Sequence, residues 1–415
     1  MAPRTIRRAA VAGLAAVALI GSAACGSGFD DSGDETQSSG PAKLEILIGS
    51  SGEAETKAVQ EAAAKWADAS GNTATVTPAQ DLTQQLGQAL AGGNPPDVFY
   101  VDASRFADYA SVGALEPYGD KISKPDDFYE SLRQTFTYDG KFYCVPKDFS
   151  TLALQINTDL WTKAGLTDAD VPTTWDQLTA TARKLKAAGQ VPLVVADTRD
   201  RIGAFMVQSG GWLTSADGKQ ATGDTPENVQ ALTYVKTLLT EGLARYPKQL
   251  DAGWGGEAFG KGKAVMTIEG NWIKGALQND FPNVKYKVVP LPAGPKGQGT
   301  LSFTNCWGIA AKSAHKEQAI KFVEAMTTGE QQMTFATAFG VMPSRQSVRD
   351  QYTQQFPADK PFIDGAEYAQ GPVNAPKMDS VLKDLDTGLN TLATGDPKAV
   401  LARFDQNAKS ALGGS

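Results

Sequence analysis

The chain has 415 residues, 41% hydrophobic, 20% charged and 8% aromatic, and its 39 basic and 46 acidic residues give a net charge of −7 at pH 7. This composition is typical of globular proteins, and it excludes a disordered, collagen-like or multi-span membrane chain. It shows no basic excess, so we expect no nucleic-acid partner. The length predicts about two or three domains with a large core.

Residues 1–24 have the features of a bacterial export signal. A start containing three arginines precedes an apolar run over 9–20, which is too short to span a hydrocarbon core of about 30 Å. The end of this segment, Ser-Ala-Ala-Cys over 22–25, resembles a lipobox. We therefore expect lipidation of Cys25 and an extracytoplasmic protein anchored to the cell membrane, with a plain secreted protein as the alternative. Residues 25–41 are rich in Gly, Ser and Asp and predict a flexible tether.

Two further cysteines, Cys144 and Cys306, remain once Cys25 is lipidated. Outside the cell an even pair favours a disulfide, and two buried thiols are the alternative. Neither cysteine has another metal-ligating residue at a suitable spacing, so we expect no metal and no cofactor.

From residue 43 the chain alternates strand-like and helix-like segments. Apolar runs predict strands over 43–49, 73–77 and 97–101, and helical spacing predicts helices over 53–70 and 82–91. This order predicts an α/β fold with a mostly parallel, doubly wound sheet, which binds ligands at the carboxyl ends of its strands. Later segments continue the pattern, with extended segments over 140–146, 151–157, 191–196, 263–268, 284–289 and 303–310, and helices over 175–188, 225–242, 314–326 and 380–392.

Two isolated features suggest enzyme chemistry only weakly. The segment GGEAFGK over 255–261 has the spacing of a phosphate loop, but Gly262 stands where Ser or Thr is required and a strand follows instead of a helix. The single histidine, His315, lies in a polar helix start and is not expected to act as a base. We expect no enzyme activity, with an exported glycoside hydrolase as the remaining enzyme alternative.

Several phrases in order resemble the extracellular solute-binding proteins of carbohydrate ABC importers, the family of maltose-binding protein. They include LEILIGSSGEAE, GGNPPDVFYVDASRFADYASVGALEPY, DGKFYCVPKDFSTLALQINTDLW, TTWDQLTATARKL, AFGKGKAVMTIEGNWIKG and TNCWGIAAKSAHKEQAIKFVEAM, followed by FGVMPSR. The resemblance covers nearly all of the mature chain.

This resemblance implies a two-lobed periplasmic-binding-protein fold of type II, with a doubly wound mixed sheet in each lobe. One lobe would comprise 42–149 plus 307–342, and the other 150–306 plus 343–415. The hinge would have three crossing segments, near Asp148–Leu152, Ser302–Trp307 and Gly340–Arg345. Cys144 and Cys306 then fall beside crossings, where a disulfide would join neighbouring strands of the first lobe.

A sugar site needs aromatic rings for C–H faces and planar polar groups for hydroxyls. Trp272 follows a strand end, and the resemblance implies that its ring stacks on a sugar; it also places Asp148 and Ser150 on the cleft floor. Asp102 ends a strand but could merely cap a helix, Glu53 could only complement a helix dipole, and Asp200 could form a surface pair with Arg201. Trp307 could instead pack in the core. The candidate ligand-binding residues are Ser51, Glu53, Asp102, Asp148, Ser150, Asp200, Trp254, Asn271, Trp272 and Trp307.

The expected function is that of a carbohydrate-binding receptor of an ABC sugar importer, which captures a mono- or oligosaccharide by hinge closure. Its partners would be the carbohydrate and the permease subunits in the membrane, and we expect a monomer. The alternative is a binding protein for a non-sugar solute, either a polyamine or glycerol phosphate.

Overall fold

The computed structural model describes residues 41–413. The predicted export signal, Cys25 with its predicted lipidation, and the predicted tether up to residue 40 lie outside the described residues. Within the described part of the chain, no helix combines the length and the apolar character needed to cross a membrane.

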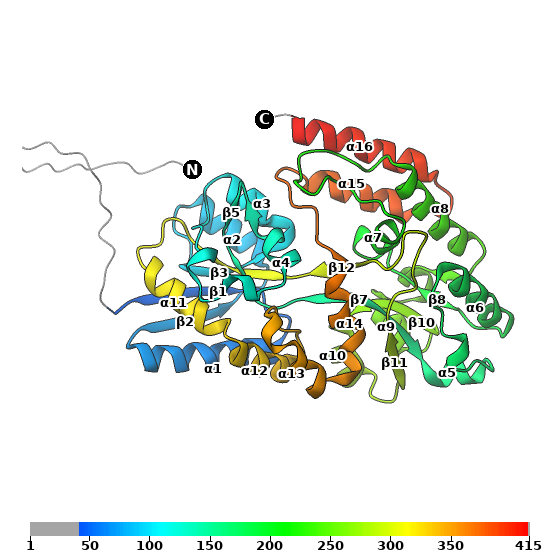
Figure 1. The fold of residues 1–415 in the computed structure, drawn as a ribbon, viewed down its shortest axis with the longest axis horizontal. Coiled ribbons are helices and arrows are strands. Elements are labelled where there is room, and N and C mark those ends of the chain that lie inside the picture. The colour runs from blue at the N-terminus through cyan, green and yellow to red at the C-terminus, as the bar shows by residue number, and fades with distance from the viewer. Residues whose placement is uncertain (1–40, 414–415) are drawn as a thin grey trace, which may run out of the picture. The chain divides into compact units, whose positions relative to one another are not determined.

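The first sheet is a mixed sheet with the strand order β2-β1-β3-β13-β6. Figure 1 shows its strands β1, β2 and β3. β1 runs parallel to β2 and β3, whereas β13 is antiparallel to both of its neighbours. Its strands are β1 (Lys43–Ile48), β2 (Thr73–Pro78), β3 (Val98–Asp102), β6 (Val145–Pro146) and β13 (Asn305–Ile309), and the helices of this part are α1 (Glu53–Ser70), α2 (Leu82–Ala91), α3 (Ala103–Ser111), α4 (Glu130–Thr135), α11 (Lys316–Met326) and α12 (Gly329–Phe339). A separate hairpin pairs β4 (Thr137–Tyr138) with β5 (Lys141–Phe142).

The second sheet is also mixed and has the order β14-β12-β7-β10-β8-β9, with β11 added beside β7. Every residue of β7 is buried. It is an interior strand, with β10 paired to one edge and β11 and β12 to the other. The strands of this sheet are β7 (Ser150–Asn157), β8 (Leu193–Val194), β9 (Ala244–Arg245), β10 (Met266–Gly270), β11 (Tyr286–Val289), β12 (Thr300–Phe303) and β14 (Ala369–Gln370).

Helices accompany this second sheet along most of the remaining chain. They are α5 (Thr158–Lys163), α6 (Trp175–Ala187), α7 (Arg199–Gln208), α8 (Pro226–Thr240), α9 (Gly255–Gly260), α10 (Ile273–Asp280), α13 (Arg349–Gln355), α14 (Lys360–Asp364), α15 (Asp379–Asn390) and α16 (Pro397–Gly413). The C-terminal pair α15 and α16 packs on α7 and α8 (Figure 1).

Local sequence signals account for the helix bounds that were predicted correctly. α1 ends at Gly71, whose φ of 70° is readily adopted only by glycine. Asp81 caps α2 by accepting from the backbone N–H of Gln84. At the start of α6, the Thr174 hydroxyl accepts from the N–H of Gln177 in the same way.

The strand predicted over 303–310 is confirmed over 305–309, but its predicted start is wrong. It divides at Thr304 into β12, which pairs with β7, and β13, which pairs with β3 and β6. Thr304 is buried at the break, where its hydroxyl lies 2.6 Å from the Asp148 carbonyl oxygen and donates to it. The segment therefore changes sheets at this residue, which lies inside the predicted crossing Ser302–Trp307.

Each sheet has its own hydrophobic core. Ile46, Phe99 and Phe322 belong to the core of the first sheet, and Leu154 and Phe205 to that of the second. A smaller cluster, which includes Phe149, Met342 and Tyr352, packs where the chain passes between the sheets.

Cys144 and Cys306 form a disulfide with Cα atoms 5.6 Å apart. Both sulfurs are buried in the core of the first sheet. Cys306 lies in β13 and Cys144 just precedes β6, so the bond joins two paired neighbours of the first sheet.

Candidate functional site

A cavity of about 1340 Å³ is lined by residues from both sheets. The loop after β1 contributes Ser51, the last residue of β3 is Asp102, and the turn after β10 contributes Trp272. The connection between β12 and β13 adds Thr304 and Asn305. Strand ends therefore form the cavity, as expected for doubly wound sheets.

The structure brings most of the predicted site residues together in this cavity. Its lining includes Ser51, Glu53, Asp102, Asp148, Ser150, Asp200, Trp254, Asn271 and Trp272.

Trp307 does not line the cavity, so its prediction as a ligand-binding residue is wrong. Its side chain is only 1% exposed and packs edge-on against Tyr100 and Phe322, with ring centroids 4.7 and 5.8 Å away. Trp307 is therefore part of the first core, which was the alternative interpretation. The cavity residue on this strand is Asn305, two positions earlier.

Trp272 has the opposite environment. It is 37% exposed, a high value for so large an apolar side chain, and it lies directly after β10 at the start of α10. The ring of Phe303 meets it edge-on, with centroids 5.2 Å apart. The cavity therefore has an accessible indole next to a second aromatic ring.

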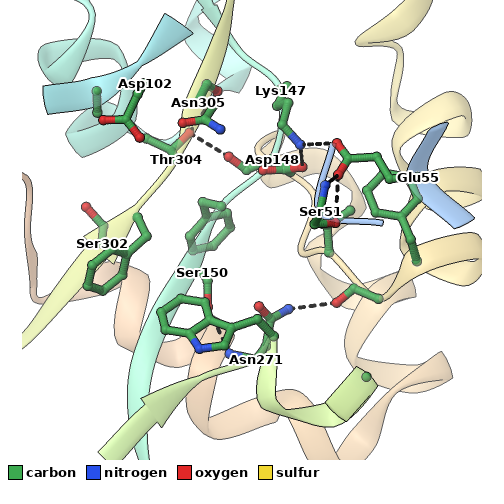
Figure 2. A pocket seen from close by; sticks show the side chains of 18 of the residues that line it. Ser51, Glu55, Asp102, Lys147, Asp148, Ser150, Asn271, Ser302, Thr304 and Asn305 are labelled. Carbon is green, nitrogen blue, oxygen red and sulfur yellow. Dashed lines mark hydrogen bonds and ion pairs between the residues drawn. The ribbon is translucent and has the colours of Figure 1, made fainter. Parts of the chain in front are cut away.

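Asp102 combines the two roles that were considered for it. Its Oδ1 accepts from the backbone N–H of Ser104 at 2.8 Å and so caps α3. The residue is nevertheless exposed and lines the cavity. Asn305 is its partner in the pairing of β3 with β13, and Figure 2 shows the two side chains near each other. A carboxylate and an amide can thus contact one ligand together.

A buried ion cluster of Glu55, Lys147 and Asp148 forms another part of the wall (Figure 2). Lys147 Nζ lies 2.9 Å from Glu55 Oε1 and also contacts the Asp148 carboxylate. Burial alone would raise the pKa of Glu55, but the Lys147 charge and the hydrogen bonds from Ser51 lower it overall. The pKa of Asp148 is raised instead, because its desolvation outweighs the attraction of Lys147 and Glu55 repels it.

Several predicted hydroxyl and amide ligands are already engaged within the protein. The Ser51 hydroxyl donates to Glu55 Oε2 at 2.7 Å. The Ser150 hydroxyl accepts from the Asn271 backbone N–H at 3.0 Å, and the Asn271 side chain donates to the Gly340 carbonyl. The polar groups of these residues form hydrogen bonds within the protein, so their main role is to shape the cavity wall.

The ring of Trp254 lies against the first turn of α9. A Cβ on Gly256 would lie 2.1 Å from the Trp254 ring, so only glycine leaves room for this orientation. Trp212 is half-buried and lines the cavity as well.

Sequence reasoning missed Glu55, Lys147, Phe303 and Asn305. Lys147 precedes the predicted Asp148, and Asn305 lies within a predicted crossing, so position alone could have suggested both. No sequence signal pairs Glu55 with Lys147, which lie 92 positions apart. Within residues 41–413, no group of His, Cys, Asp and Glu side chains is arranged to hold a metal ion.

Two mixed α/β sheets whose strand ends line one large cavity define a solute-binding protein of the periplasmic-binding-protein class. The sequence model of the bacterial extracellular solute-binding proteins matches residues 50–333. The chain belongs to this family.

Comparison with individual proteins agrees with this assignment. The diacetylchitobiose binding protein of Streptomyces coelicolor is 25% identical over 80% of this chain and 80% of its own length. The maltooligosaccharide ABC transporter solute-binding lipoprotein of Streptococcus pneumoniae is 24% identical over 84% of this chain and 83% of its own. The cyclic α-maltosyl-1,6-maltose binding protein of Arthrobacter globiformis has a similar structure, with a TM-score of 0.81 at 20% identity, covering 91% of this chain and 100% of that chain. The predicted type II fold is confirmed.

Proposed function

We propose that this protein is the carbohydrate receptor of an ABC importer and binds an oligosaccharide in its cavity. The observation that carries the proposal is the exposed indole of Trp272 in a cavity of about 1340 Å³ that also presents Asp102 and Asn305. An aromatic face suits the apolar C–H face of a pyranose, and carboxylate and amide groups suit its hydroxyls. The relatives named for diacetylchitobiose and maltooligosaccharides support this ligand class.

The charges of the cavity favour an uncharged ligand. Among the described residues that line it, the cations are Lys147, Arg199 and Lys274, and each already contacts a carboxylate, as shown by the pairs with Glu55, Asp386 and Asp359. A phosphate or uronate would need a cation that is not neutralised in this way. Glycerol phosphate is therefore disfavoured as the ligand.

A polyamine is the second candidate, because carboxylates outnumber cations in the lining. Glu53, Asp102 and Asp280 line the cavity, and no cation among the residues that line it neutralises them within ion-pair distance. A polyamine would use these acids but would not need the exposed indole of Trp272. The binding test of the ligand class therefore includes a polyamine, spermidine.

We further propose that the chain forms two lobes that close around the ligand. The predicted bound after residue 306 moves to Thr304, because Asn305 and Cys306 pair within the first sheet, so the lobes are 42–149 plus 305–342 and 150–304 plus 343–415. Three connections support the hinge: the entry into β7, the break at Thr304 and the segment of Met342, which pairs with Phe149. A ligand that contacts Asp102 on one side and Trp272 on the other would favour the closed state by its differential affinity. In this proposal Cys25 anchors a monomer to the membrane beside the permease subunits, and no chemical step occurs.

Calorimetry on the full mature chain without its acyl groups tests the ligand class. The panel contains maltooligosaccharides, diacetylchitobiose, galactooligosaccharides, spermidine and glycerol 3-phosphate. We expect binding of a neutral oligosaccharide without any product, and a loss of about 1–3 kcal/mol in Trp272→Ala. The control is Trp66→Phe, because Trp66 packs against Phe322 away from the cavity. Binding of spermidine alone, or cleavage of a saccharide, would overturn the proposal.

A further inference from the structure

Glu269 is a buried carboxylate that lies behind the exposed indole of Trp272. It occupies β10 one residue before the strand ends, and only 1% of its surface is exposed. It does not line the cavity, so it is out of direct reach of a ligand there. A buried carboxylate is costly unless paired and hydrogen-bonded, and here it is both.

One oxygen of Glu269 holds two neighbouring side chains. Its Oε2 accepts from Trp272 Nε1 at 3.1 Å, and from Arg201 Nε and Nη2 at 3.1 and 2.6 Å. Arg201 in turn donates from Nη1 to the Asp200 carbonyl at 2.9 Å. The indole and the guanidinium are thereby fixed relative to a single buried atom.

The guanidinium of Arg201 also stacks on the indole. Its Cζ lies 4.9 Å from the centre of the Trp272 ring and 5.7 Å from that of Phe303. The guanidinium thus covers one face of the Trp272 ring. The Phe303 ring contacts the Trp272 ring edge-on. The exposed surface of the indole is then left on the side away from Arg201.

Two glycines and the Gln155 side chain restrict the space around Glu269 and Trp272. A Cβ on Gly270 would lie 2.1 Å from the Trp272 ring, and a Cβ on Gly255 would lie 2.5 Å from Glu269 Oε1. The Gln155 side chain also bonds both the N–H and the carbonyl of Glu269, at 3.0 and 3.1 Å. The carboxylate therefore has little freedom to move.

We propose that Glu269 and Arg201 are positioning residues that hold Trp272 as a stacking surface with one face open to the ligand. This rests on the proposed function in that the ligand is a saccharide. The pair lowers the entropy that the indole loses on binding, because the ring is already ordered. Glu269→Gln keeps an acceptor for the indole N–H but removes the charge that holds Arg201.

The first measurement needs no ligand. The full mature chain is labelled with 5-fluorotryptophan, and the ¹⁹F resonance of Trp272 is assigned by its loss in Trp272→Phe. We expect Glu269→Gln and Arg201→Lys to shift or broaden this resonance and to leave the other tryptophan resonances in place. The matched control is Glu257→Gln, which removes a carboxylate from a surface pair with Lys261. An unchanged Trp272 resonance in both variants would overturn the proposal, and Arg201→Lys suffices if Glu269→Gln does not fold.

The second measurement is the affinity for the saccharide identified in the panel. We expect Glu269→Gln to weaken binding about ten-fold. In a Trp272→Ala background the same substitution should cause no further loss, because its effect passes through the indole. An equal loss in both backgrounds would overturn the positioning role. If no saccharide binds the unaltered protein, the proposed function fails, whereas the ¹⁹F measurement still decides the positioning role.

Discussion

The side-chain amide of Asn271 donates a hydrogen bond to the main-chain carbonyl of Gly340, 2.8 Å away. Asn271 lies in the turn after β10 of the second sheet, and Gly340 ends α12, which packs on α1 beside the first sheet. The bond therefore links the elements of the two sheets at the cavity wall. Asn271 is only 5% exposed, so water cannot readily replace it.

We expect Asn271→Ala to lower the free energy of unfolding by about 1–3 kcal/mol, because the half-buried Gly340 loses the hydrogen-bond donor of its carbonyl. Urea unfolding followed by circular dichroism measures this change. Asn279→Ala serves as the control, since Asn279 is an exposed residue of the neighbouring helix, and its effect should stay within about 0.5 kcal/mol. Equal stabilities of the two variants would contradict this role.

Glu55 should make the stability depend on pH in the acidic range. Its pKa in the folded protein lies below the ordinary value of 4.5, so its contribution is complete above pH 4.5 and is lost as the pH falls through the folded pKa. Glu55→Gln should cost about 3 kcal/mol at pH 7, because Lys147 loses one buried partner. The difference from the unaltered protein should shrink as the pH falls below 4.5.

Thermal unfolding from pH 3 to pH 8 measures this effect. Glu61→Gln is the control on the same helix, because the pair of Glu61 with Lys57 is exposed and should contribute less than about 1 kcal/mol. A difference for Glu55→Gln that is independent of pH would show that the ionised carboxylate does not stabilise the fold.

Trp307 and Trp272 should respond differently to the same substitution. Trp307→Phe leaves a void in the first core and should lower stability by about 1–3 kcal/mol without changing the affinity for the ligand. Trp272→Phe should weaken binding and leave stability nearly unchanged. Calorimetric titration and chemical unfolding of both variants give the two quantities. A loss of affinity in Trp307→Phe at unchanged stability would restore Trp307 as a ligand-binding residue.

The disulfide between Cys144 and Cys306 should contribute to stability and not to ligand binding. It connects residues 162 positions apart, and its removal in Cys144→Ala/Cys306→Ala should cost about 2–5 kcal/mol. Alkylation of the denatured protein without reductant checks that the bond exists, since neither residue should then be labelled. Two labelled thiols would show that the cysteines are free.

Gly256→Ala should displace the Trp254 ring, because the added Cβ would lie 2.1 Å from it. If Trp254 contacts the ligand, affinity falls in this variant, and near-ultraviolet circular dichroism records the altered indole. The comparison variant is Gly87→Ala in α2, where the added Cβ meets nothing within 4 Å. That substitution should leave binding unchanged and stabilise the helix by about 0.5–1 kcal/mol.

Strand ends made much of the cavity predictable. Asp102 and Trp272 each follow an apolar run, and the carboxyl ends of strands in such sheets gather at one edge. Trp307 is predicted as a ligand-binding residue because it falls in a predicted crossing, and that prediction fails because the chain has already joined the first sheet at Asn305 and the ring enters the first core. A local pattern shows that a residue lies near a strand end but does not show which neighbours cover it.

The sequence by itself determined the α/β class, the bounds of α1 and α2, and most residues at the strand ends, because these depend on periodicity, caps and turns within a few positions. Only the tertiary structure decided that Lys147 is held by Glu55 and that Trp272 is held by Arg201 and Glu269. These contacts join residues from separate elements, and their energies depend on burial and on distances of a few ångströms. Such distances follow from the packing of the whole chain and not from any segment of it.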